Sequence, residues 1–179
     1  MSANGRTHWG WHQLASPAAR RLVAAANIRP GDLVLDIGAG TGALTEPLVA
    51  AGARVIAVEL HPRRAAALRS RFARPPVTVI QVDASDLRLP RRPFRVVANP
   101  PFGITTSIMR RLLSPGSRLT TADLVVPRHV ARRWADARAP GFHRWSATFS
   151  ARTVAEIPRS AFRPRPPGGI VVLRIERRA

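Results

Sequence analysis

Short apolar runs alternate with segments whose apolar residues recur at helical spacing along most of the 179-residue chain. Periodicity of this kind separates buried strands from amphipathic helices. It predicts five strands in the first part of the chain, at 33–37, 54–59, 77–82, 94–99 and 122–127. Two more strands are predicted at 146–157 and 170–175, as an antiparallel pair. The pattern therefore predicts an α/β fold with a doubly wound, seven-stranded, mostly parallel sheet.

Helices are predicted between these strands, at 16–27, 43–51, 62–72, 104–113 and 130–139. The first begins with Ser16-Pro17, an N-cap residue followed by proline at the first helical position, and it turns Leu22 and Val23 inward. Residues 158–169 form a loop rich in proline, arginine and glycine. We expect one domain over 1–179, with an N-terminal arm at 1–14, and helices on both faces of the sheet.

The charge of the chain is strongly positive. It has 29 arginines and no lysine against 10 acidic residues, for a net charge of +19. Guanidinium groups bind phosphate in a bidentate manner and stack on bases, so this composition predicts an RNA partner. There is no cysteine and no apolar run of about 18 residues, and the five histidines lack metal-ligand spacing. We therefore expect a cytoplasmic monomer with no membrane span and no metal.

A glycine turn follows the first predicted strand, in Asp36-Ile37-Gly38-Ala39-Gly40-Thr41-Gly42. Glycine permits positive φ and close approach of the backbone to a ligand, and ligands of α/β folds bind at this edge of the sheet. The pattern also fits the loose dinucleotide fingerprint, so the turn alone leaves a nicotinamide enzyme open. Together with the downstream residues described below, it predicts a site for S-adenosylmethionine (SAM).

Three acidic residues stand at strand ends where they could contact such a cofactor. Glu59 ends the second strand and could accept both ribose hydroxyls. Asp36 could hold the cofactor ammonium through ordered water. Asp83 could accept a hydrogen bond from the cofactor adenine amine, or it could simply cap the following turn.

The fourth strand ends in Asn99-Pro100-Pro101-Phe102-Gly103. The side-chain carbonyl of Asn99 and the backbone carbonyl of Pro100 could accept the two protons of a planar amine and so free its lone pair. The prolines stiffen the turn without adding a donor, and Phe102 could stack on a base. The turn and this segment together predict methyl transfer from SAM to a planar nitrogen such as the adenine amine.

These motifs resemble the erythromycin-resistance (Erm) type of rRNA adenine N6-methyltransferase, in its short actinomycete-like form. The resemblance rests on 36–45, Val58-Glu59, Asp83, 99–103 and Phe162-x-Pro164-x-Pro166. It implies a Rossmann-like methyltransferase fold and methylation of an adenine in large-subunit (23S) rRNA. Such methylation confers resistance to macrolides, lincosamides and streptogramin B.

The resemblance also implies site residues. The catalytic residues would be Asn99, Pro100 and Phe102, and the cofactor would contact His12, Leu14, Asp36, Gly38, Gly40, Glu59, Leu60, Asp83, Ala84 and Asn99. RNA would contact Phe102, Phe162, Arg110, Arg111, Arg133 and Arg163. For Phe162, packing on the core is an equal alternative. Further RNA contacts are expected among Arg63, Arg64, Arg132, Arg165 and the four tryptophans 9, 11, 134 and 145, with core packing favoured for Trp145 in its strand.

The sequence departs from this family at both ends. The N-terminal Gln-Asn/His-Phe-Leu segment of the family reads Trp11-His12-Gln13-Leu14 here, so His12 or Gln13 would supply its cofactor contacts. The chain stops after the last predicted strand, so we expect no helical C-terminal domain. We expect the arginines of the catalytic domain to bind RNA in its place, with a looser choice among adenines as a further hypothesis.

Other functions stay open. Asn-Pro-Pro-aromatic also occurs in methyltransferases that act on small-subunit rRNA adenine, DNA adenine or a release-factor glutamine. The charge favours nucleic acid, and the chain has no insert for DNA recognition. A non-catalytic RNA-binding assembly factor on the same scaffold is a further alternative, against which the intact glycine turn, Glu59 and Asn99 argue.

Overall fold

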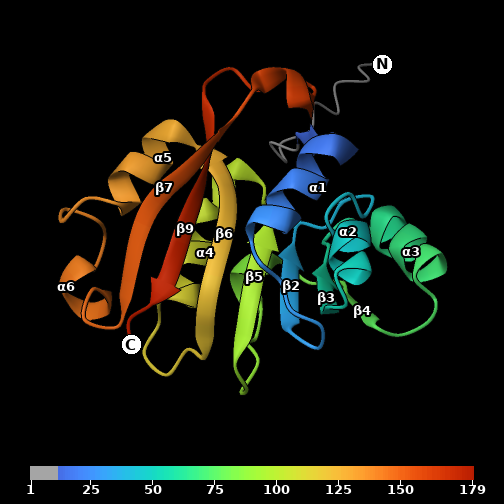
Figure 1. Cartoon of the computed structure of the whole chain (residues 1–179), viewed down its shortest axis with the longest axis horizontal. Coiled ribbons are helices and arrows are strands. Elements are labelled where there is room, and N and C mark those ends of the chain that lie inside the picture. Colours follow the sequence, from blue (N-terminus) through green and yellow to red (C-terminus); the bar gives the residue numbers. More distant parts are fainter. Residues whose placement is uncertain (1–11) are drawn as a thin grey trace, which may run out of the picture.

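The parallel part of the sheet comes from the first five long apolar runs. The computed structural model describes residues 12–179, and its main sheet has the order β4-β3-β2-β5-β6-β9-β7 (Figure 1). The parallel strands are β2 (Leu33–Ile37), β3 (Arg54–Val58), β4 (Val77–Ile80), β5 (Phe94–Ala98) and β6 (Leu119–Pro127). Every residue of β2 is buried, because helices cover both faces of this central strand.

The other two strands reverse the direction of the sheet. Strand β9 (Ile170–Arg177) lies between β6 and β7 (Phe149–Ile157) and is antiparallel to both. The predicted antiparallel pair and the predicted seven-stranded sheet are therefore confirmed. The order of strands reverses between β2 and β5, so their carboxyl ends diverge there and leave the crevice where such sheets bind ligands.

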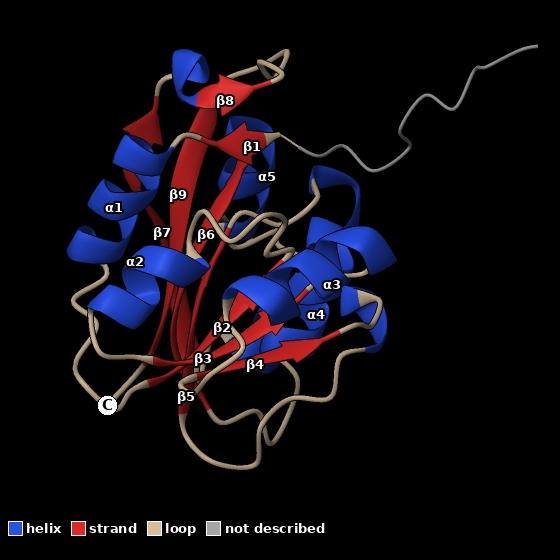
Figure 2. Cartoon of the chain, turned by 90° about the vertical axis from the view of Figure 1, so that its right-hand side faces the viewer, coloured by secondary structure: helices blue, strands red, loops and turns tan. Residues whose placement is uncertain are grey.

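Helices cover the two faces of the sheet in two groups. On one face lie α1 (Ser16–Ala25), α2 (Thr45–Ala50) and α3 (Pro62–Arg71). On the other lie α4 (Thr105–Leu112), α5 (Arg128–Trp134) and α6 (Phe142–Trp145). Figure 2 shows α1 and α2 on one side of the sheet and α4 and α5 on the other. Right-handed crossovers explain the division, because the chain steps outward through β3 and β4 and then back across β2 to β5 and β6.

Several predicted bounds need correction. Strand β6 begins at Leu119 rather than at 122, and α5 ends at Trp134 rather than at 139. The predicted strand at 146 begins at Phe149, because Gly141, with φ +68°, starts the short helix α6. Trp145 belongs to this helix and not to a strand. Short helices of this kind carry too little periodic pattern to be seen in a sequence.

Two of the tryptophans considered for stacking on RNA bases are part of the core. Trp134 and Trp145 are 1% and 5% exposed, and their ring centroids lie 6.2 Å apart. The indole N–H of Trp145 donates to the Pro140 carbonyl at 3.1 Å. The predicted base stacking is therefore wrong for Trp134, and the packing alternative holds for Trp145. Trp9 and Trp11 lie outside the described residues.

A second, two-stranded sheet ties the N-terminal arm to the Pro/Arg loop. Strand β1 (Gln13–Leu14) pairs antiparallel with β8 (Phe162–Arg163), and the Ala15 N–H donates to the Ala161 carbonyl at 2.8 Å. Within the described part of the chain, three short 3₁₀ turns complete the fold, η1 (Ala84–Asp86), η2 (Phe102–Ile104) and η3 (Arg159–Ala161). The sequence did not predict this pairing, which places the arm beside the loop 158–169.

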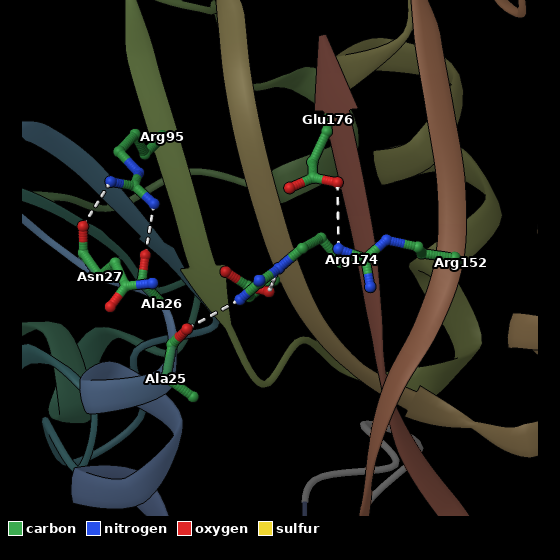
Figure 3. A network of polar contacts seen from close by, with 8 residues as sticks. Ala25, Ala26, Asn27, Arg95, Arg152, Arg174 and Glu176 are labelled. Carbon is green, nitrogen blue, oxygen red and sulfur yellow. Dashed lines mark hydrogen bonds and ion pairs between the residues drawn. The ribbon is translucent and has the colours of Figure 1, made fainter. Parts of the chain in front are cut away.

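Arginines hold the C-terminal end of α1 on the sheet (Figure 3). Arg95 donates to the carbonyls of Ala26 and Asn27, and Arg174 donates to the carbonyl of Ala25 at 3.0 Å. Positive side chains at a helix C-terminus satisfy its last carbonyls and complement its dipole. Arg174 also donates to the buried carboxylate of Asp123 at 2.7 Å. This network fixes α1, and with it the arm that α1 follows.

Among residues 12–179, no helix is long and apolar enough to cross a membrane, and no cluster of three or more histidines and acidic residues could hold a metal ion.

Candidate functional site

The glycine turn after β2 packs directly on the Asn-Pro-Pro segment after β5. Gly38 has φ +78°, and a Cβ atom there would come within 2.9 Å of the Pro101 side chain. The N–H groups of Gly38 and Ala39 donate to the Val58 carbonyl at 2.8 and 3.0 Å. A side chain at position 38 would thus push apart the two predicted halves of the site. The glycine lets them meet at the crevice between β2 and β5.

A small hollow lies between this turn and the N-terminal arm. Its lining combines glycines and alanines with polar side chains and two leucines, and it consists of Gln13, Leu14, Asp36, Gly38, Ala39, Gly40, Thr41, Ala43, Leu44 and Asn99. The Gln13 amide donates to the Thr41 hydroxyl at 3.0 Å and joins the arm to the turn. Backbone groups, a carboxylate and an amide around small side chains fit the amino-acid part of a SAM molecule. Four predicted cofactor residues, Leu14, Asp36, Gly38 and Gly40, together with Asn99, meet here.

Asp36 is a buried carboxylate in the wall of this hollow. It is 1% exposed, and its Oδ2 accepts a hydrogen bond from the Thr45 hydroxyl at 2.6 Å. Burial, with a further contribution from the negative charge of Glu59, raises the pKa of Asp36 to about 7. A cation bound in the hollow would favour the ionised form of this carboxyl. The predicted contact with a cofactor ammonium remains a prediction.

Glu59 follows β3 and is 3% exposed. Its Oε2 accepts the Gly40 N–H at 2.9 Å, and its Oε1 accepts the His61 N–H at 2.8 Å. The Arg64 guanidinium also donates to Oε1, from Nε at 3.1 Å and from Nη2 at 3.0 Å. The carboxylate therefore has protein donors on both oxygens, and its predicted contact with ribose hydroxyls remains a prediction.

Asn99 sits directly after β5 and is half-buried. Its side-chain N–H₂ donates to the backbone carbonyl of His12 at 2.7 Å. An amide whose nitrogen is held this way has its oxygen set on the other side, where it can accept from a ligand. Pro100 beside it is buried, and neither proline carries an N–H that could compete. The predicted acceptance of an amine proton by the Asn99 oxygen remains a prediction.

Phe102 lies in η2 with its ring half-buried, and the His12 ring stacks on it. The ring centroids are 5.3 Å apart and the planes differ by 25°. The His12 ring nitrogen Nδ1 is also 2.8 Å from the Pro164 carbonyl oxygen. His12 was predicted as a cofactor contact. Its ring instead lies on the predicted base platform, while Gln13 and Leu14 line the hollow.

Three further predicted cofactor residues, Leu60, Asp83 and Ala84, are not among the residues that line the hollow. Asp83 caps η1, because its Oδ1 accepts the Ser85 N–H at 2.8 Å. The capping alternative therefore holds for that oxygen, and contact with an adenine amine remains a prediction. Ala84 is 8% exposed within the core, and Leu60 is half-exposed beside Glu59.

Phe162 is a core residue in this structure. Its ring is 0% exposed, and it packs in the cluster that includes Leu14, Leu22 and Val125. A ring with no exposed surface cannot stack on a base. The expectation of a base contact is therefore corrected in favour of the packing alternative. The strand pairing of 162 with Leu14 explains the burial, since it draws the loop onto α1.

The four arginines predicted to contact RNA fall into two pairs. Arg111 donates to the Ser85 carbonyl, and Arg163 donates to the carbonyls of Ser160 and Phe162. Arg110 and Arg133 are exposed, and neither makes a hydrogen bond or ion pair within residues 12–179. Arginine in this chain therefore serves two purposes, to satisfy backbone carbonyls and to carry surface charge. A count of arginines cannot separate them.

Sequence reasoning missed some of the polar contacts at the site. The Gln13–Thr41 hydrogen bond and the Arg64–Glu59 ion pair join positions 28 and 5 residues apart. The second has a local signal, because position 64 falls in the first turn of the helix that follows Glu59. The Gln13–Thr41 hydrogen bond has no local sequence signal, since only the fold brings the arm to the turn.

Comparisons with known proteins agree with this geometry. The family model for ribosomal RNA adenine dimethylase matches residues 2–179. The chain belongs to this family. SAM is the methyl donor of the family, so the predicted cofactor is confirmed, as is the predicted relationship to the Erm type.

Individual relatives come from both branches of the family. The chain is 39% identical to an rRNA adenine N-6-methyltransferase of Corynebacterium diphtheriae, over 79% of this chain and 57% of the relative. It is 34% identical to the ribosomal RNA small subunit methyltransferase A of Thermosynechococcus vestitus, over 94% of this chain and 68% of the relative. Against several curated relatives, including two from Streptomyces, the chain spans little more than half their length.

Among solved structures, the 23S rRNA methyltransferase ErmE superposes with a TM-score of 0.81 at 30% identity. The match covers 91% of this chain and 68% of ErmE. The predicted Rossmann-like methyltransferase fold is thereby confirmed.

Proposed function

We propose that this protein methylates the exocyclic N6 of an adenine in large-subunit (23S) rRNA, with SAM as methyl donor. The Asn99 amide carries the proposal. Its nitrogen donates to the His12 carbonyl at 2.7 Å, Asn99 lines the hollow beside the glycine turn, and Phe102 lies in the η2 turn that follows. That arrangement presents an acceptor and an aromatic face beside a cofactor hollow.

The chemistry required of the residues is modest. The lone pair of an adenine amine is delocalised into its ring, which makes the amine a weak nucleophile. Asn99 Oδ1 and the Pro100 carbonyl would accept the two amine protons and favour the pyramidal form with a free lone pair. The bound cofactor supplies an electrophilic methyl group. As the amine nitrogen forms a bond to the methyl carbon, the bond between that carbon and the cofactor sulfur would break. The methylated amine is acidic and would then lose a proton to solvent.

Alignment is the main catalytic contribution on this account. Holding two reactants in line can supply roughly 7–11 kcal/mol. The packing of Gly38 on Pro101 provides that alignment, because it joins the cofactor turn to the amine acceptors without an intervening side chain. No side chain of the site needs to act as a general base.

The choice of large-subunit RNA is supported by relatives rather than by a contact. The Corynebacterium diphtheriae relative is named for rRNA adenine N6 methylation, and ErmE for methylation of 23S rRNA. If the same adenine is the target here, its methylation would confer resistance to macrolides, lincosamides and streptogramin B. Methylation of small-subunit rRNA is the second candidate, favoured by the Thermosynechococcus vestitus relative, of which the chain covers 68%.

The deciding experiment is transfer of labelled methyl from SAM to separate pools of protein-free large-subunit rRNA, small-subunit rRNA, DNA and release factor. Primer extension then locates the modified nucleotide. Label in large-subunit rRNA at the drug-binding loop is the expected result. Label confined to small-subunit rRNA would favour the second candidate. Absence of label from every RNA pool, with SAM binding intact, would refute rRNA methylation by this chain.

A further inference from the structure

The Glu59 carboxylate is nearly saturated with donors from the protein itself. It is 3% exposed and accepts four hydrogen bonds, from the Gly40 N–H, the His61 N–H and two nitrogens of Arg64. A carboxylate offers about four lone-pair sites in all, two on each oxygen. Within residues 12–179, Oε1 receives three of these donors and Oε2 receives one. The carboxylate therefore has room for one further donor, on Oε2.

A ribose ring brings two donors at once. Its neighbouring 2′- and 3′-hydroxyls are oriented to reach both oxygens of one carboxylate. One hydroxyl could use the remaining site on Oε2, but the second requires a site on Oε1. A donor already on Oε1 must therefore leave before both hydroxyls can bind.

Arg64 is the donor that can leave. The Gly40 and His61 donors are backbone N–H groups, set by the glycine turn and by the cap of α3, so neither can move unless those elements unfold. Arg64 is a long side chain on the first turn of α3, and 24% of its side chain is exposed against 4% for Glu59. After its departure, Glu59 would keep two backbone donors and the favourable field of a helix N-terminus. The carboxylate would stay in place for the ribose.

We propose that Arg64 is a latch on Glu59, which must release the carboxylate when the ribose of the cofactor binds and which thereby sets cofactor affinity. The proposal rests on the proposed function, since it assumes that SAM or its product occupies the hollow. Arg64 is a positioning residue on this view and touches no reacting atom. While no ribose is bound, the ion pair between Arg64 and Glu59 keeps the buried carboxylate paired.

The test measures binding rather than turnover. S-Adenosylhomocysteine, and the same molecule with a 2′,3′-dideoxyribose, are titrated by calorimetry into the full-length protein. The variants are Arg64→Met, which keeps the length of the stem, and Arg63→Met as a matched control. Arg63 is exposed on the same helix turn and makes no ion pair within the described chain. Arg64→Lys, which retains the charge but loses the guanidinium fork, is a second variant should Arg64→Met fold poorly.

Arg64→Met should bind S-adenosylhomocysteine roughly fivefold more tightly than the wild type, as expected for release of one partly exposed ion pair. Affinity for the dideoxy ligand should not change, because that ligand has no ribose hydroxyls that could donate to Glu59. Arg63→Met should match the wild type with both ligands, and Arg64→Lys should lie between the wild type and Arg64→Met.

Weaker or equal binding of the diol ligand by Arg64→Met would overturn the latch and show that Arg64 holds Glu59 ready. Equal tightening for both ligands would overturn it too, since the effect would then be one of charge alone. If the folded wild type binds neither ligand, the cofactor assignment and with it the proposed function fail, which is a different outcome from a failed latch.

Discussion

Two buried aspartates on strands separated only by β5 have different surroundings. Asp36 on β2 and Asp123 on β6 are both 1% exposed, and burial raises the pKa of each. Asp123 accepts a charged donor, the Arg174 guanidinium, at 2.7 Å. Asp36 accepts a neutral one, the Thr45 hydroxyl, and no cation pairs with it within residues 12–179.

The difference separates a structural carboxylate from one that can serve a ligand. Asp123 has its counter-ion inside the fold, and the same arginine caps α1 (Figure 3). Asp36 lies in the wall of the hollow, with its pKa raised to about 7 and its charge uncompensated. Loss of the Arg174 partner of Asp123 should lower stability, whereas changes at Asp36 should affect binding and catalysis.

The largest effect is expected from Arg174→Met. Removing one partner of a buried ion pair leaves an uncompensated charge and typically costs about 3–5 kcal/mol. Asp123 Oδ2 has no hydrogen-bond partner within residues 12–179, so the remaining carboxylate would have little to compensate it. Urea unfolding measures the loss. Arg152→Met is the control, because its partner Glu176 is 40% exposed and such pairs contribute about 0–1 kcal/mol. Equal losses of unfolding free energy in both variants would contradict the assignment of Asp123 as a structural carboxylate.

Asn99→Ala should act on turnover and leave stability nearly unchanged. Removal of one preorganised hydrogen-bonding group from an active site typically lowers kcat by roughly 10²–10³-fold. Cofactor affinity should stay within a few fold, because the glycine turn and Glu59 are untouched. Single-turnover methyl transfer, calorimetry and thermal unfolding on one preparation make the comparison. Unchanged transfer would remove Asn99 from the amine-binding role.

The pH dependence of Asp36 gives a smaller effect with a definite sign. Its pKa is about 7 in the folded protein against an ordinary aspartate pKa of 3.8, so the folded state binds this proton more tightly. The stabilising contribution is full below about pH 4 and is lost as pH rises through 7. A bound cation should favour the carboxylate, so SAM affinity should rise through the same range with release of a proton.

Asp36→Asn should remove both effects. Stability between pH 5 and 8 should become flatter, and SAM should bind roughly tenfold more weakly at pH 8. Unfolding curves across pH measure the change in stability. Calorimetry in buffers of different ionisation enthalpy measures SAM affinity and the release of the proton. A variant that still releases the proton on binding would show that another group titrates.

The smallest effect is expected on the surface. Arg110 is exposed on α4, and each phosphate contact contributes about one unit to the slope of log affinity against log salt. Arg110→Ala should reduce that slope by roughly one for a large-subunit rRNA fragment. Arg20→Ala, on α1 at the opposite face, should leave the slope unchanged. Equal changes in both would indicate a diffuse charge effect with no defined RNA face.

Sequence reasoning reached the strands, the glycine turn and the Asn-Pro-Pro-Phe-Gly segment at 99–103 because each carries a local signal. Four of the five residues of β2 are apolar, Gly38 needs positive φ, and Asn99 directly follows a strand at the ligand edge. It failed for Trp134 and for the base contact of Phe162, since an aromatic residue looks the same in sequence whether it binds RNA or packs inside. The core residues around these two rings come from several separate strands and helices. Arg163 donates to carbonyls close by in the chain, and its contact with RNA stays a prediction.

The sequence by itself determined the type of fold, the family and the two halves of the site, because these depend on periodicity and on residues close together in the chain. Only the tertiary structure decided which groups are already engaged. It paired Asp123 with Arg174 and Glu59 with Arg64, left Asp36 with a neutral donor, and placed the His12 ring on Phe102. The physical reason is that burial and pairing set the state of a polar group, and both are properties of the folded chain.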